Sequence, residues 1–426
     1  MKAKQMRHAA WIAPALMALG LLGGCGGNHN QNTAQVRMLN AVVDAEALGM
    51  LIDDGSKATG IAPGSTSSFT EANSGTRDVK IVSATTAAVL LEKSLAFPDG
   101  TNDTVLVYGR RATMQASVLA DETTTISSGH LRVRVVNLAP DTGSVDVYIG
   151  TGDISTLPAA IIGAAAGNVT ASAEVSPGSA PITITTSGTQ DVLFTSAAQT
   201  FAAGQYMTIV VVPTPGGHLV NAITMVQGGA TTFLQNPVSR VKATNGIADA
   251  AAGFNFRVDG SPLLLNVPFT GSSSYINVAS GSHTLQLEPA NVPGSTAASA
   301  TTTLNGATDY SVVALGTSSS PKLTVIADDN SAPGTGLAKV RFVNGGSTPV
   351  DVQVNFASEV SNLAVGAAST YFNAGPSLTY TMTFTTPGGL TVLASATNIE
   401  IDVGGVYTAY LLGATAPQQI RVVRDR

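Results

Sequence analysis

The sequence predicts an all-β protein made of four tandem antiparallel β-sandwiches, and three observations support this. A five-residue motif, an alternating strand that ends in Asn, occurs four times, at Val36–Asn40, Val133–Asn137, Val241–Asn245 and Val340–Asn344. The copies lie about a hundred residues apart, which is the length of one sandwich domain. Between them, short alternating strands are separated by Gly and Pro turns, and no stretch keeps a helical period.

The motif strand alternates apolar and basic residues. Because successive side chains point to opposite faces of a strand, Val133 and Val135 are expected to face a core and Arg134 to face water. The equivalent basic residues are Arg37, Lys242 and Arg341. They form either a row that binds anions or a partner, or, as the simpler interpretation, charges that discourage edge-to-edge strand pairing. The closing Asn suits a strand end because it hydrogen-bonds its own backbone in turns.

Further strands complete each repeat. The second strand alternates in the same way, as in Val145–Ile149, where Asp146 is expected to face water. Tyr206, Tyr310 and Tyr407 stand near the start of the penultimate strand and are expected to pack and bond a neighbouring turn, as tyrosine corners do. About six or seven short strands per repeat predict immunoglobulin-like sandwiches.

The motif positions divide the chain. We expect β-sandwich repeats at residues 36–122, 131–235, 238–329 and 337–426, after a signal peptide (1–24) and a lipidated cysteine with a flexible tether (25–35). The junctions between repeats are short and polar, and two contain proline, which favours an extended string of domains with restricted bending.

The N-terminus has the pattern of an export signal, with Lys2, Lys4 and Arg7 before an apolar stretch at residues 9–22. The sequence Leu22-Gly23-Gly24-Cys25 then resembles the lipobox of bacterial lipoproteins. That resemblance implies cleavage between Gly24 and Cys25, lipidation of Cys25 and, because Gly26 rather than Asp follows, the outer membrane. The alternative is an ordinary signal peptide with an accidental cysteine.

Composition excludes several functions. Charged residues make up 11% of the chain and the net charge is −6, so nucleic acid is an unsuitable partner. A single cysteine rules out internal disulfides and Cys-based metal centres. His130, His218 and His283 belong to different segments, and the common hydrolase, nucleotide and metalloprotease motifs do not occur. We therefore expect no metal, no cofactor and no enzymatic activity.

The motif also resembles a known family. The stretch Arg132–Asp141 followed by Val145–Tyr148, and Val340–Asn344 followed by Pro349–Val352, are similar to the bacterial family called domain of unknown function 4397. The resemblance implies an exported protein. Since the family has no established activity, it assigns no catalytic residue.

Together these features indicate a non-enzymatic cell-envelope lipoprotein that serves as a spacer or as an adhesion or interaction module. Its expected partners are the membrane, through the lipid, and an envelope or extracellular protein or glycan. The alternative is a periplasmic or surface binding protein for a small molecule, glycan or peptide, which would use loops at the sandwich ends. The long insertion at residues 150–170 is where such a loop is expected.

Overall fold

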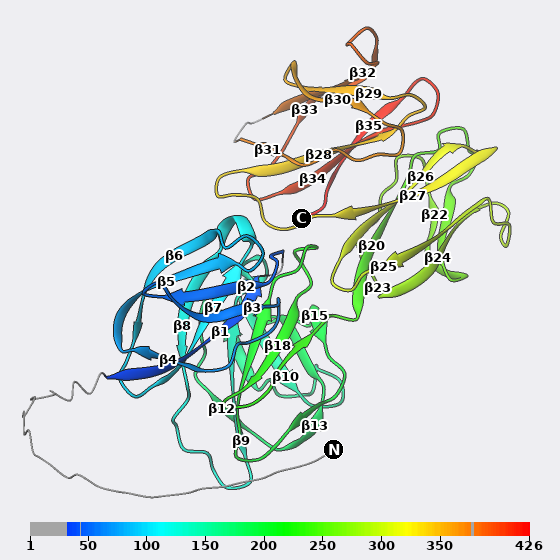
Figure 1. Ribbon diagram of the computed structural model, residues 1–426. Helices are drawn as coiled ribbons and strands as arrows, with labels where there is room; N and C mark the ends of the chain where they lie inside the picture. Colours follow the sequence, from blue (N-terminus) through cyan, green and yellow to red (C-terminus); the bar gives the residue numbers. More distant parts are fainter. Residues whose placement is uncertain (1–31, 43, 376–378) are drawn as a thin grey trace, which may run out of the picture.

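The computed structural model describes residues 32–42, 44–375 and 379–426, and it is all-β as predicted (Figure 1). In these ranges the only helical elements are two single-turn 3-10 helices, η1 (Arg111–Thr113) and η2 (Pro140–Thr142). The strands form four sandwiches in chain order, which we call the first to fourth repeats.

The strands of the first two repeats cover residues 33–234. Those of the first repeat are β1 (Thr33–Val42), β2 (Leu48–Ile52), β3 (Gly55–Ile61), β4 (Thr70–Asn73), β5 (Gly75–Ser83), β6 (Val89–Phe97), β7 (Asn102–Gly109) and β8 (Gln115–Ala120). Those of the second are β9 (Leu131–Asn137), β10 (Val145–Ile149), β11 (Ile161–Ala164), β12 (Ala173–Val175), β13 (Gly178–Ala180), β14 (Ile182–Thr186), β15 (Val192–Thr195), β16 (Gln199–Phe201), β17 (Tyr206–Val212), β18 (Asn221–Val226) and β19 (Thr231–Leu234).

The strands of the last two repeats cover residues 238–424. Those of the third repeat are β20 (Val238–Asn245), β21 (Phe254–Val258), β22 (Ser261–Val267), β23 (Ile276–Ala279), β24 (Gly281–Pro289), β25 (Ala298–Leu304), β26 (Asp309–Thr317) and β27 (Ser320–Asp328). Those of the fourth are β28 (Ala338–Gly345), β29 (Val350–Val354), β30 (Ala357–Leu363), β31 (Phe372–Ala374), β32 (Tyr380–Thr385), β33 (Val392–Ile399), β34 (Val406–Leu412) and β35 (Gln419–Arg424).

Each repeat pairs two sheets. The sheet that contains the motif strand, which we call the motif sheet, has the order β4-β1-β7-β8, β12-β9-β17-β18-β19, β23-β20-β26-β27 or β31-β28-β34-β35. The opposite sheets run β3-β2-β5-β6, β11-β10-β14-β15, β22-β21-β24-β25 and β30-β29-β32-β33, and the second repeat has in addition the two-stranded sheet β13-β16. Neighbouring strands are antiparallel, except that each motif strand runs parallel to one strand late in its repeat, which is β7, β17, β26 or β34.

Every repeat has its own hydrophobic core between the two sheets. In the second repeat, Val133 and Val135 of the motif strand and Val145 and Val147 of β10 are fully buried in one cluster. The other three repeats have separate clusters of the same kind. The inward half of the predicted alternation is therefore confirmed.

The motif asparagines explain why each motif strand ends where it does. Asn40, Asn137, Asn245 and Asn344 are all fully buried. Each Oδ1 accepts the backbone N–H two residues later, at 2.9 to 3.2 Å, as predicted for a local turn. Each Nδ2 donates to a carbonyl at or next to the edge strand of the opposite sheet, at 2.9 to 3.0 Å. One side chain thus ties the two sheets together.

The repeats pack in pairs, which differs from the extended string that the short junctions favoured. The outer faces of the first two motif sheets meet in an apolar cluster, the first seam, made by Leu39, Ala41, Leu106, Leu119, Val136, Leu138, Val210, Val212, Ile223 and Met225. The third and fourth repeats meet in the same way in the second seam, made by Val313, Leu315, Val343, Tyr410 and Leu412. Figure 1 shows the two pairs as separate bodies, with β1 to β19 in one and β20 to β35 in the other.

Two further expectations are corrected, the one for Asp146 and the one for Tyr206. Asp146 does not face water; it is buried and accepts hydrogen bonds from the Gly163 and Gly188 amides at 2.7 and 2.9 Å. Tyr310 and Tyr407 do bond a turn, because each hydroxyl accepts an N–H from five residues earlier.

Tyr206 is not their equivalent. It lies one register position earlier, so its side chain points the other way and bonds Thr124 in the junction.

Candidate functional site

The predicted row of basic residues lies inside the seams and not on the surface. Arg37, Lys242 and Arg341 are 4%, 1% and 2% exposed, and Arg134 is half-buried. The expectation that they face water is therefore wrong. A neighbouring repeat covers the outer face of each motif sheet. Along the motif strand, the apolar side chains next to each basic residue therefore point into the core of their own repeat and the basic side chains point into the seam. The row is not available to a soluble anion or partner.

In the second seam, two ion pairs cross between the repeats in a reciprocal arrangement. Lys242 of the third repeat binds Asp425 of the fourth, and Arg341 of the fourth binds Asp328 of the third. The two aspartates hold equivalent places, at the end of the last strand or one residue beyond it, opposite the start of the penultimate strand. The seam therefore has an approximate twofold symmetry.

Hydroxyl groups complete these ion pairs. Ser311 donates to Asp328 and Thr408 donates to Asp425, again from equivalent positions. Burial alone would lower the pKa of Arg341, but the Asp328 carboxylate raises it above its ordinary value. The guanidinium stays charged, and the pair acts as a fixed crosslink between repeats.

The first seam has only half of this arrangement. Arg134 donates to the Ala120 carbonyl at 2.8 Å and lies in the field of two carboxylates, Glu122 and Asp121, of which Asp121 holds the place of Asp328. Gln227 holds the place of Asp425, so the second repeat presents no carboxylate opposite Arg37, which is acted on, among the described carboxylates, only by Asp121 of its own repeat. Within the described part of the chain its Nη2 finds no hydrogen-bond partner, and burial lowers its pKa.

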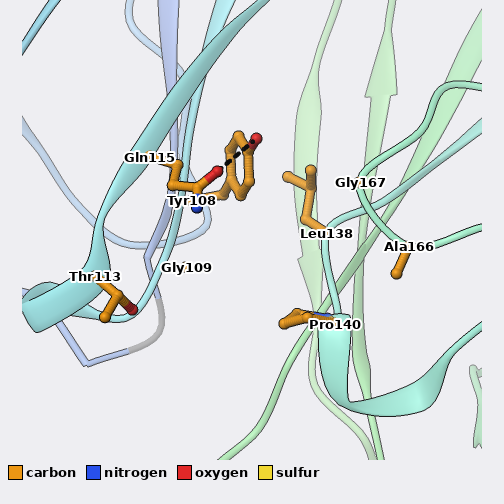
Figure 2. Close-up of a pocket in the computed structure, with 8 residues that line it drawn as sticks. All are labelled: Tyr108, Gly109, Thr113, Gln115, Leu138, Pro140, Ala166 and Gly167. Carbon is orange, nitrogen blue, oxygen red and sulfur yellow. Dashed lines mark hydrogen bonds between the residues drawn. The ribbon is translucent and has the colours of Figure 1, made fainter. Parts of the chain in front are cut away.

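A cleft of about 240 Å³ opens at one end of the first seam (Figure 2). It is lined by Tyr108, Gly109, Thr113, Gln115, Leu138, Pro140, Ala166 and Gly167. Figure 2 shows Tyr108, Gln115 and Thr113 of the first repeat on one wall, facing Leu138 and Pro140 of the second. The Tyr108 hydroxyl donates to Gln115 Oε1 at 3.4 Å, which sets the ring against the open space.

The second seam has a cleft of about 440 Å³ at the equivalent place. It is lined by Leu315, Gly316, Thr317, Ser320, Lys322, Thr324, Gly346, Ser347, Val365, Gly366 and Ala414. Gly109 and Gly316 hold equivalent places, at the end of β7 and one residue before the end of β26, with φ of 94° and 91°. The Gly167 and Gly366 amides both donate to the carbonyl of the motif asparagine at 2.7 Å. The paired fold thus produces the same cleft twice, and none of the described residues that line either cleft carries a carboxylate.

A third cavity, of about 270 Å³, lies where the two pairs meet. It is lined by Asp141, Gly217, His218, Arg240, Asn330, Asp425 and Arg426. Arg426 of the fourth repeat donates to the Asp141 carbonyl at 2.7 Å, and the Ala332 amide donates to Asp141 Oδ1 at 2.8 Å. Every hydrophobic cluster of the described residues lies within one pair, so this contact between the pairs is polar.

Other predicted sites stand as follows. Gly24 and Cys25, the predicted cleavage and lipidation site, lie outside the described residues, as does the signal peptide. Within the described ranges, His, Cys, Asp and Glu side chains form no group of three or more suited to a metal. None of the described helical turns has the length and apolar character needed to cross a membrane.

Comparison with solved structures finds only distant likenesses. One is the Bacillus anthracis TIE protein, at 11% identity, covering 87% of this chain and 66% of that one, with a TM-score of 0.15. Another is the CBM26 module of Eubacterium rectale Amy13K in complex with maltoheptaose, at 13% identity, 46% and 97% coverage and a TM-score of 0.16. A third is a product complex of the pneumococcal glycogen-degrading virulence factor SpuA, at 7% identity, 85% and 37% coverage and a TM-score of 0.17. TM-scores this low carry no argument about function.

Family comparison is more informative. No curated protein matches the chain. The family model described as domain of unknown function DUF4397 matches residues 34–148 and 239–348, which together make up more than half of the sequence. The first match begins at the motif strand of the first repeat and ends in the second repeat. The other begins at the motif strand of the third repeat and ends in the fourth. The chain belongs to the DUF4397 family.

Proposed function

We propose that this chain is a non-enzymatic cell-envelope lipoprotein whose repeats form a rigid spacer or interaction module. The observation that carries the rigidity is the seam: two repeats share an apolar interface with buried ion pairs crossing it. A pair joined in this way moves as one body, unlike domains on a flexible linker. The basic n-region, the apolar stretch and Cys25 support export and attachment through lipid, with the outer membrane as the proposed location.

The attachment is tested by replacing Cys25. In the native host, the Cys25→Ala protein is expected in the soluble envelope fraction, while the unchanged protein stays with membranes. Protease treatment of intact cells then separates a surface module, which is cut, from a periplasmic one, which is protected. Membrane association of Cys25→Ala equal to that of the unchanged protein contradicts the lipid anchor.

A second candidate function is ligand binding, and the seam clefts favour it. They combine a turn of one repeat with the end of a strand of another, and their walls mix apolar and hydroxyl groups. This is the composition of small-ligand and peptide sites. Binding of a small molecule, glycan or peptide that is lost when a cleft side chain is replaced supports this candidate.

A further inference from the structure

We propose that the cleft of the first seam is a docking slot for an extended, proline-containing peptide. This inference deepens the second candidate function, and it is independent of the lipid anchor. Leu138 belongs to the first-seam cluster, Tyr108 packs against that cluster, and both line the cleft, so the slot is the open end of an apolar interface that already exists. A partner that enters it extends that interface.

The walls have the chemistry that a polyproline segment needs. An aromatic ring, Tyr108, faces Leu138 across the gap, and Pro140 lies farther along the same wall as Leu138, toward Thr113 (Figure 2). Polyproline helices dock in grooves lined by aromatic side chains, because their rings stack there and because they are already ordered before binding. The apolar side chains of this cleft supply such a groove.

The polar groups of the cleft also match. Proline has no N–H, so a proline-rich segment offers carbonyl acceptors and needs donors from its partner. Gln115 accepts the Tyr108 hydroxyl through Oε1, while its Nε2 donates to none of the described residues. Thr113 adds a hydroxyl, and the cleft has no carboxylate to repel carbonyl oxygens or to bind a cation.

The second seam provides an internal comparison. At the equivalent cleft, Leu315 stands in the place of Tyr108, Ser347 in that of Pro140 and Lys322 in that of Gln115. The backbone arrangement is the same and the aromatic ring and the proline are both gone. The proposed specificity therefore belongs to the first cleft alone.

Fluorescence anisotropy with the full purified protein tests the proposal. The probe is a labelled, blocked polyproline peptide, and the comparison probes are a Gly-Ser peptide of equal length and a neutral glucose oligosaccharide. We expect the polyproline peptide to bind, the Gly-Ser peptide to bind at least about tenfold more weakly, and Tyr108→Leu and Pro140→Ser each to weaken polyproline binding by about tenfold. Leu315→Ala, in the other cleft, should change nothing.

Several results overturn the proposal. These are no polyproline binding at millimolar protein, equal binding of the Gly-Ser peptide, binding of the oligosaccharide alone, and unchanged binding by both variants of the first cleft. Pro140 is exposed, so Pro140→Ser should fold normally and keeps the test valid if Tyr108→Leu does not fold. The thermal unfolding of Tyr108→Leu is measured in parallel. A failed peptide titration leaves the Cys25→Ala result untouched, so the two proposals fail separately.

Discussion

Removing one partner of a seam ion pair should destabilise the second pair of repeats strongly. In Lys242→Met, the Asp425 carboxylate remains at 0% side-chain exposure, with the Thr408 hydroxyl as its remaining donor. An uncompensated buried charge of this kind costs about 3 to 5 kcal/mol. The cost should appear in urea unfolding followed by circular dichroism, as a lower midpoint for the transition of the third and fourth repeats.

Two controls separate the ion pair from the packing of the side chains. The double variant Lys242→Met with Asp425→Leu removes both charges, and it should recover most of the loss because buried ion pairs and apolar replacements of similar volume have similar stability. Lys80→Met breaks a surface pair with Asp54 and should leave the transition unchanged. A loss under about 1 kcal/mol for Lys242→Met, or a double variant as unstable as the single one, refutes the reasoning.

Three further predictions concern the other buried polar groups. Asn137→Ala should destabilise the second repeat by about 2 kcal/mol or more in urea unfolding, because it leaves buried carbonyls without donors. Burial would raise the pKa of Asp146, but hydrogen bonds from Gly188 and Gly163 outweigh it and lower that pKa below its usual range. The stability that the Asp146 carboxylate contributes is present above its pKa in the unfolded chain and is lost as pH falls through its pKa in the folded protein. Asp146→Asn has no such charge to lose, so its thermal stability should fall less steeply below about pH 4 than that of the unchanged protein. Asp141→Ala removes the carboxylate that pairs with Arg426 and accepts the Ala332 amide, two contacts that join the two pairs of repeats. Small-angle scattering should then show a larger radius of gyration, while the unfolding transition of each pair stays unchanged.

The four repeats could be predicted because their signals are local. Period-two alternation and the closing asparagine are written within each motif, and the Asn side chain performs the turn role expected of it. The burial of the outer faces was missed, because alternation identifies a core face and says nothing about what covers the other face. A signal was present: Val135 and Val136 are adjacent apolar residues, and so are Phe342 and Val343, which is unusual for a strand with one wet face.

The carboxylates that pair with the basic motif residues could also have been inferred from the sequence. Asp121, Asp328 and Asp425 recur at one place, the end of the last strand or just beyond it, as regularly as the basic residue recurs in the motif. A charge of each sign repeated at fixed positions predicts pairing between copies once the sheets are known to face each other. The clefts could not be predicted, because their walls come from two repeats whose relative placement no local pattern encodes.

The asymmetry between the seams has a physical consequence for which repeats pair. The second repeat carries Gln227 where the fourth carries Asp425, so any repeat packed against it loses the carboxylate for its own motif cation. A lysine such as Lys242 in that position would be a buried, unpaired ammonium. Arg37 tolerates the loss better, because its guanidinium stacks on Phe69 at 4.7 Å and bonds Thr104 at 3.0 Å. Pairing of the second repeat with the first is therefore favoured over pairing with the third by the chemistry of the seam, in addition to the order of the repeats along the chain.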